Sequence, residues 1–136
     1  RRHGLEDAVT FHGWLSRADL EPLYAVAHLL LLPSDSEGFP KVLSEAMAFG
    51  VVPVAGAVSS IPQSLAELGT GRAVPPGDVD AFAGAVIGYL DDPATWSADS
   101  RRGVEGAEVF AYDGYLRDVT TMAQEAWGLD LQVLGR

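Results

Sequence analysis

The stretch Leu29–Val54 constrains the fold more than any other part of this 136-residue chain. It holds two apolar runs, Leu29–Leu32 and Val51–Ala55, each with the length and composition of a buried strand. Between them, a helix is predicted to begin at Pro40 and to stop at Gly50. Its apolar residues recur at helical spacing: Val42, Leu43, Ala46 and Met47. The pattern predicts a βαβ unit whose helix start offers free N–H groups and partial positive charge, a site that suits phosphate.

Helical patterns alternate with β-prone runs along the rest of the chain. A short strand is predicted at Val9–His12. Asp78 is placed to cap a helix, and Asp91-Asp92-Pro93 to break one. The further predicted helices are Asp19–Ala27, Ile61–Leu68, Val79–Leu90, Trp96–Val109 and Tyr115–Trp127. This alternation predicts an α/β fold with a parallel sheet covered by helices on both faces.

Three loops follow predicted strands and are therefore expected at one edge of the sheet. They are Gly13–Arg17, Pro33–Phe39 and Gly56–Pro62. In open parallel sheets, ligands bind beyond the carboxyl ends of the strands. The convergence of these loops predicts a binding site at that edge.

Two glutamates flank the start of the central helix, with seven residues between them. Glu37 lies in the loop, and Glu45 lies one to two turns into the helix, where its side chain leans back toward the helix start. Two carboxylates at a cationic helix end can accept hydrogen bonds from sugar hydroxyls while the amides bind phosphate. In the alternative interpretation, Glu37 caps the helix and Glu45 is a solvated surface residue. Taken as a lone pair of glutamates, the alternative is favoured, and only the surrounding motif overturns it.

Charge and composition exclude several classes of protein. The formal net charge is −10 and Lys41 is the one lysine, which argues against general binding to nucleic acid or anionic membranes. No apolar run approaches the roughly 18–20 residues of a membrane span, so no transmembrane segment is expected. There is no cysteine and hence no disulfide scaffold. A cytoplasmic location is expected, with peripheral contact to the inner membrane face left open.

Three aromatic and imidazole side chains receive structural interpretations. Trp14 lies in a loop, where stacking on a ligand ring is one option, but the residue is interpreted as a packing anchor. His12 and His28 have no partner at metal-ligand spacing and are interpreted as structural. The sequence therefore predicts no metal site.

The residues from Glu37 to Ala48, EGFPKVLSEAMA, resemble the E-x7-E signature of retaining GT-B glycosyltransferases of the family 4 type. Pro33-Ser34 before the motif and Gly50–Val54 after it match the same family. The resemblance implies the C-terminal, donor-binding Rossmann-like domain of such an enzyme. It also implies retaining hexosyl transfer from a UDP-, GDP- or ADP-sugar to an acceptor, with the nucleotide sugar as substrate, no cofactor and no metal.

The resemblance assigns roles residue by residue. Glu45 would hold the ribose hydroxyls, while Glu37 and the amides of Gly38 and Phe39 would face the donor sugar and its phosphate. Glu37 and Glu45 are thus the catalytic candidates, although no covalent attack by Glu37 is implied. The donor-binding candidates are Leu15, Arg17, Gly38, Phe39, Pro40, Lys41, Ser59 and Ser60.

The chain departs from the family pattern in the loop after the second apolar run. Ser59 and Ser60 stand where the family commonly has two glycines, and Gln63 stands near the position of a glutamate. The serine hydroxyls can bond phosphate or sugar, or they can cap the following helix. These departures motivate a second hypothesis, a non-catalytic GT-B-like module for binding or assembly.

The alignment with the family implies that two βα units precede Val9–His12 and are missing here, together with a Gly-rich loop and basic residues. We therefore expect one partial domain, residues 1–136, with C-terminal helices over about 95–128, inactive without an N-terminal acceptor-binding domain as partner. In the family's strand order, Val9–His12 would not pair with Leu29–Leu32. Bare strand edges invite association, so the unpaired strand edge at Val9–His12 and the C-terminal helix are the surfaces expected for self-association.

Overall fold

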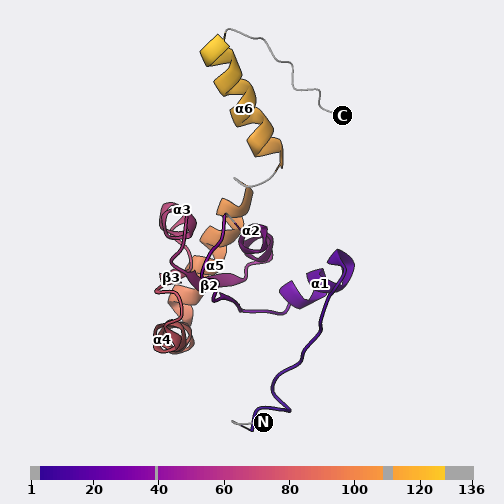
Figure 1. The fold of residues 1–136 in the computed structure, drawn as a ribbon, viewed down its shortest axis with the longest axis vertical. Coiled ribbons are helices and arrows are strands. Elements are labelled where there is room, and N and C mark those ends of the chain that lie inside the picture. Colours follow the sequence, from indigo (N-terminus) through magenta and orange to yellow (C-terminus); the bar gives the residue numbers. More distant parts are fainter. Residues whose placement is uncertain (1–3, 39, 109–111, 128–136) are drawn as a thin grey trace.

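The computed structural model of the protein describes residues 4–38, 40–108 and 112–127. Its centre is a three-stranded parallel sheet in the order β1-β2-β3, with β1 at Leu29–Leu32, β2 at Val52–Gly56 and β3 at Arg72–Val74. Leu29 pairs with Val52 at the start of the first ladder. The predicted α/β class is confirmed, and the architecture is a Rossmann-like parallel sheet flanked by helices (Figure 1).

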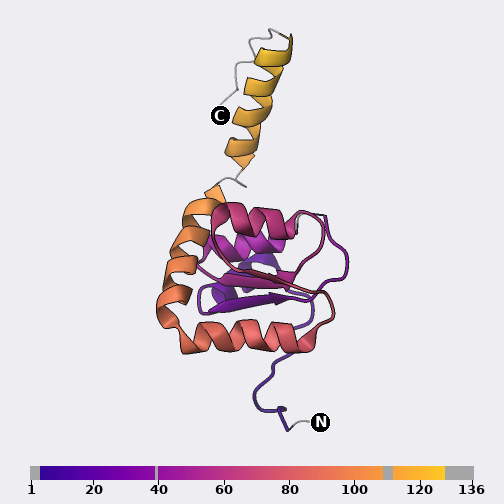
Figure 2. The same ribbon diagram turned by 90° about the vertical axis from the view of Figure 1, so that its left-hand side faces the viewer.

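Helices cover both faces of the sheet. Figures 1 and 2 show α2 and α3 on one face, α4 on the other, and α6 extending beyond the packed body. The helices are α1 Arg17–Tyr24, α2 Lys41–Ala48, α3 Ile61–Leu68, α4 Val79–Asp91, α5 Pro93–Ala107 and α6 Tyr112–Trp127. Each crossover helix returns the chain to the amino end of the next strand, as parallel pairing requires.

The core forms two layers because successive side chains of β2 point to opposite faces. On the α4 side, the buried cluster is Val52, Val54, Val74, Ala85 and Tyr89. On the α2–α3 side, it is Leu43, Met47, Ala55, Ile61 and Leu65. All five residues of β2 are buried, which explains why this strand is apolar without alternation.

Local sequence signals account for most helix boundaries. The side chain of Ser16 accepts a hydrogen bond from the Asp19 N–H, and Asp78 accepts one from the Ala81 N–H at 2.9 Å. Gly50 follows α2 in the left-handed region, with φ +79°, as a helix-ending glycine does.

Several predicted boundaries shift. Pro40 is the N-cap of α2 and not its first helical residue, α1 ends at Tyr24 and not at Ala27, and Asp92 serves as the end of α4 and the N-cap of α5. α5 therefore begins at Pro93, before the predicted Trp96, because proline suits the first turn of a helix.

The predicted strand at Val9–His12 is wrong. In the described structure this segment is irregular and exposed, and Phe11 has 92% of its surface accessible. β1 pairs only with β2 and Val9–His12 forms no ladder in the described sheet, so the expectation that it does not pair with Leu29–Leu32 is confirmed. The interpretation of Trp14 as a packing anchor is also wrong, since its side chain is 89% exposed.

α5 crosses the amino ends of β2 and β3 and is tied there by polar contacts. Ser100 donates to the Gly50 carbonyl at 2.7 Å, and Thr70 donates to the Asp99 carbonyl at 2.7 Å. The Asp99 carboxylate is buried, accepts a 2.5 Å hydrogen bond from the Tyr89 hydroxyl and pairs with Arg102. These contacts hold α5 across the amino edge of the sheet.

His28 has the structural role predicted for it. Its ring packs against Trp96 with the centroids 5.3 Å apart, and its backbone carbonyl accepts the Trp96 indole N–H at 3.0 Å. His12 is exposed in the irregular segment.

Replacing Tyr89 with phenylalanine is expected to reduce the alkaline sensitivity of the protein. Burial, together with the hydrogen bond to Asp99, raises the pKa of the Tyr89 hydroxyl. The associated stabilisation is complete below the unfolded-state pKa of about 10 and is lost as the pH rises toward the raised folded-state pKa. Urea unfolding between pH 8 and pH 11 should show a steeper loss of stability in the wild type than in Tyr89→Phe. A residual slope should remain, because burial also raises the pKa of Tyr24; identical slopes would contradict the assignment.

Candidate functional site

The carboxyl edge of the sheet is built from two loops that run side by side. The first follows β1 as Pro33–Gly38, and the second follows β2 as Ala57–Ser60. They meet first at Gly56 and Ser34: a Cβ added to Gly56 would lie 2.6 Å from the Ser34 carbonyl oxygen. Only glycine permits this backbone approach, so Gly56 determines how closely the loops pack.

The loops meet again at Ser59. The Ser59 hydroxyl donates a hydrogen bond to the backbone carbonyl of Glu37. Ser59 has φ +50°, and it is the one non-glycine residue with positive φ in the part of the chain that the structure describes. The hydroxyl that the sequence offered to phosphate or sugar is therefore engaged within the protein.

Three helix starts lie at this edge, because α2, α3 and α4 each follow a strand of the parallel sheet. The start of α4 is occupied by its cap, Asp78. At α3, Pro62 lacks an N–H and the Ile61 N–H bonds the Val58 carbonyl. Ser60 is the N-cap of α3, but its side chain makes no capping hydrogen bond.

α2 offers the most open set of donors. Its N-cap, Pro40, is buried and has no hydrogen-bonding side chain to give. The N–H groups of Lys41 and Val42 donate to no residue that the structure describes. Gly38 precedes this start, and a Cβ added to it would meet nothing within 4 Å, so a ligand can approach its backbone. Phe39, the other amide of interest, lies outside the described residues.

The two candidate glutamates keep their carboxylates available. Glu37 is half-buried in the loop and Glu45 is exposed on α2. Within residues 4–38, 40–108 and 112–127, neither carboxylate makes a hydrogen bond. The alternative in which Glu37 caps α2 is therefore wrong, whereas its other part, that Glu45 lies on the solvated surface, agrees with the exposure of Glu45. These carboxylates are therefore free to accept hydroxyl groups.

Two residues of α1, Arg17 and Tyr24, lie within electrostatic range of Glu45. Arg17 pairs with Glu21 at 2.9 Å, and this pairing, reinforced by Glu45, raises the pKa of the Arg17 guanidinium. Burial, and secondarily Glu45, raises the pKa of Tyr24 on the same helix. Leu15 is half-buried just ahead of the α1 N-cap. Glu45 therefore acts on α1 through its charge, while Arg17 is paired with Glu21.

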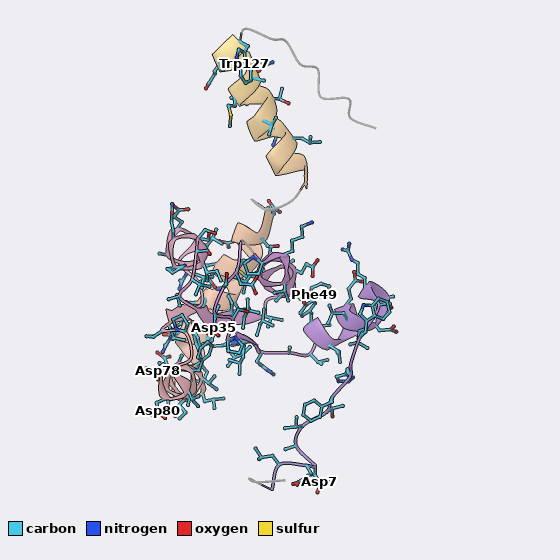
Figure 3. All side chains as sticks on the ribbon, viewed as in Figure 1. Asp7, Asp35, Phe49, Asp78, Asp80 and Trp127 are labelled. Atoms are coloured by element: carbon cyan, nitrogen blue, oxygen red, sulfur yellow. The ribbon has the colours of Figure 1, made fainter. Side chains whose placement is uncertain are left out.

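The edge also carries acidic side chains that oppose anion binding. Asp35 is exposed in the loop after β1, and Asp78 and Asp80 begin α4 after β3 (Figure 3). Because Asp78 already satisfies the α4 start, an anion at this edge is favoured at α2 over α4. Lys41, the first residue of α2, is exposed and supplies positive charge there.

The structure adds Ser34 and Gly56 to the residues identified from the sequence. Only the backbone atoms of Ser34 and Gly56 make this contact, and their close approach aligns the two loops. A glycine at the end of a buried strand is a signal of close backbone approach, and this signal could have identified Gly56 from the sequence.

The structure shows no metal centre and no membrane span in the part of the chain it describes. No three His, Asp or Glu residues are grouped there so as to hold a metal ion. None of the described helices combines the length and apolar character needed to cross a bilayer.

Residues 1–107 match the family model described as glycosyl transferases group 1. A D-inositol 3-phosphate glycosyltransferase of Kribbella flavida is 35% identical over 123 residues, covering 90% of this chain and 28% of that protein. O-antigen chain mannosyltransferase B of Escherichia coli is 32% identical over 108 residues, covering 79% of this chain and 28% of that protein. The chain therefore spans about a quarter to a third of the length of such relatives.

Two solved structures share the fold. Sucrose-phosphate synthase from Thermosynechococcus elongatus gives a TM-score of 0.80 at 30% identity, covering 93% of this chain and 32% of that one. Anabaena Alr3699/HepE, in complex with UDP, gives a TM-score of 0.80 at 23% identity, covering 91% of this chain and 34% of that one. The second likeness shows the fold alone.

Proposed function

The chain belongs to the group 1 glycosyl transferases, and from that premise we propose that it binds the nucleotide-sugar donor of a retaining GT-B glycosyltransferase. One observation carries the proposal: the open amides at the start of α2 lie between two glutamates whose carboxylates are unengaged within the described residues. The amides suit phosphate oxygens and the carboxylates suit hydroxyl groups. A nucleoside diphosphate sugar presents both.

Each candidate residue has a role in this proposal. Glu45 accepts the ribose hydroxyls, and Glu37 accepts hydroxyls of the donor sugar. The amides of Gly38 and Phe39, with the Pro40–Lys41 start of α2, face the phosphates. Leu15, Arg17, Ser59 and Ser60 form the walls around them. The chemistry is electrostatic support for a departing diphosphate, with anomeric configuration retained.

The charge available at this edge limits what the chain contributes. A helix end stabilises an anion by about 0.3–1 kcal/mol, or up to ~2 kcal/mol when partly buried. The protein's net charge of −10 works against a diphosphate. We therefore propose that further basic residues and an N-terminal acceptor-binding domain complete the working enzyme, and that residues 1–136 alone have little or no transferase activity.

The remaining parts of the proposal concern assembly and setting. Residues 1–136 form one donor-binding domain that uses no metal or cofactor. The domain works in the cytoplasm, and peripheral binding to the inner membrane face is a second location to test. Two surfaces are proposed for self-association: α6, and the edge of β1 that pairs with no strand in the described sheet and exposes Leu31.

Replacing Glu45 with glutamine is expected to weaken UDP binding by about tenfold, because a charge-assisted hydrogen bond contributes about 1.5–3 kcal/mol and glutamine keeps only part of it. UDP is the first nucleotide to test because a structural neighbour was solved with it. The measurement is an NMR titration of the chain with UDP, then GDP and ADP, following the amides of Gly38 and Glu45.

Glu105→Gln is the matched control, since it removes the same charge from an exposed position on α5. Binding that is equally weakened in both variants, or unchanged in Glu45→Gln, would contradict the role of Glu45. For the intact protein, absence of glycosyl transfer and of donor hydrolysis with every nucleotide sugar would overturn the enzyme assignment.

A non-catalytic module is the second candidate function. The engaged Ser59 hydroxyl and the acidic edge favour it, since both reduce the affinity expected for a diphosphate. Nucleotide binding that depends on Glu45, together with transfer by the intact protein, would decide against this candidate.

A further inference from the structure

The contact between Ser59 and Glu37 orients one particular peptide group. The hydrogen bond from Ser59 ends on the Glu37 carbonyl, which shares its peptide plane with the Gly38 N–H. Every described peptide bond is trans, so this carbonyl and this N–H point in opposite directions. The Gly38 N–H is therefore directed away from Ser59, and it donates to no residue that the structure describes.

The β1–β2 pairing leads up to this contact. In the β1–β2 ladder, Leu32 pairs with Ala55. Beyond the ladder, Ser34 lies against Gly56 and Glu37 receives the bond from Ser59, three residues further along each loop. The side-by-side course of the two strands thus continues into the loops and ends at Ser59.

We propose that Ser59 is a positioning residue that holds the Glu37–Gly38 peptide with its N–H toward the ligand side and its carbonyl toward Ser59. Without the Ser59 hydroxyl, this peptide group can flip, so that its carbonyl and its N–H exchange directions. The flipped state requires a positive φ at Gly38, and glycine adopts a positive φ at little cost. The flipped peptide presents a carbonyl oxygen, which repels phosphate. The link to donor binding rests on the function proposed above, whereas the orientation of the peptide does not.

The backbone of Ser59 supports a positioning role. A positive φ is unfavourable for serine, and the surrounding structure must hold it. Glycine would accept this φ without cost but has no hydroxyl. The chain therefore keeps a residue that is locally unfavourable and whose hydroxyl reaches the neighbouring loop.

The first test is made on the free protein and needs no ligand. Ser59→Gly and Ser59→Ala both remove the hydroxyl, and the glycine variant also relieves the backbone, so it is expected to fold. In both, the Gly38 amide should shift and broaden through exchange between two orientations, and its N–H residual dipolar coupling should change. Ser64→Ala, on α3 and outside the loops, should leave the Gly38 signal unchanged.

The second test is a double-mutant cycle with UDP as the probe. Ser59→Gly should weaken UDP binding about two- to tenfold, the range for one lost hydrogen bond. Gly38→Ala fits sterically and disfavours the positive φ that the flipped state requires. In the Gly38→Ala background, Ser59→Gly should therefore change the dissociation constant by less than about twofold, whereas a hydroxyl that touched the ligand directly would cost the same in both backgrounds.

The outcomes separate the two proposals. A Gly38 amide that is unaffected by both Ser59 variants overturns the positioning role, whatever UDP does. A Gly38 amide that responds as expected, in a chain whose UDP binding ignores Glu45→Gln, supports the positioning role and contradicts the donor site. Equal losses in the two arms of the cycle overturn the peptide-orientation explanation.

Discussion

Replacing Asp99 with alanine is expected to lower the free energy of unfolding by about 2–4 kcal/mol. Asp99 is only 6% exposed, and its carboxylate is shared by the Tyr89 hydroxyl and Arg102. A buried hydroxyl left without its acceptor costs ~1–3 kcal/mol, and loss of the partner of a partly buried charge adds to this. The variant also leaves Arg102 with only its bond to the Gly69 carbonyl among the described contacts.

The measurement is urea-induced unfolding at neutral pH, with Asp91→Ala as the matched control. Asp91 is exposed at the end of α4, so its removal should change stability by less than about 0.5 kcal/mol. Asp99→Asn should fall between the wild type and Asp99→Ala, because an amide still accepts the Tyr89 hydroxyl. If Asp99→Ala lowered the free energy of unfolding no more than the control does, this network would not stabilise the packing of α5 on the sheet.

Replacing Gly56 with alanine is expected to cost about 1–3 kcal/mol of stability and to weaken UDP binding more than any single side-chain change in the loops. The new methyl group would lie 2.6 Å from the Ser34 carbonyl oxygen. The position of the methyl group is set by the backbone of residue 56, and the oxygen belongs to the backbone of Ser34. No rotamer change can therefore relieve the contact, and the loops must separate. Separation would also break the bond between Ser59 and Glu37.

Gly84→Ala is the control for this substitution. Gly84 lies within α4 with open space around it, so alanine there should stabilise the protein by about 0.5–1 kcal/mol. The thermal unfolding temperature should therefore fall below that of the wild type in Gly56→Ala and rise above it in Gly84→Ala. The affinity for UDP should change only in Gly56→Ala. A Gly56→Ala protein with unchanged stability and unchanged Gly38 amide signals would contradict the close-approach explanation.

The local pattern is sufficient to predict the elements around the candidate site. α3 has its predicted bounds because its periodicity is strong and Gly69 ends it in the left-handed region. α2 and the two flanking strands follow from apolar runs separated by a helical stripe, since a buried parallel strand needs apolar residues on both faces. The position of the site follows from topology, because parallel strands bring their following loops to one edge.

Patterns whose outcome depends on a distant partner gave wrong predictions. Val9–His12 has strand-like composition but no strand beside it in the described sheet, and composition cannot supply the missing hydrogen bonds. Trp14 is apolar enough to anchor a core, but no surface in the described structure covers it. In both cases, burial is decided by what the rest of the fold places nearby.

The sequence alone determined the apolar runs and the central helix of the βαβ unit, the Asp78 cap of α4 and the pair of glutamates at a helix start, because these follow from the order of residues over short stretches. The tertiary structure alone decided that the Ser59 hydroxyl bonds the Glu37 carbonyl and that Asp99 joins Tyr89 to α5. The Ser59–Glu37 contact joins residues 22 positions apart. A serine hydroxyl can donate to water, to a ligand or to the protein, and the local sequence does not distinguish these acceptors. The choice among these depends on how closely two backbones approach, which Gly56 permits and the packing of the sheet enforces.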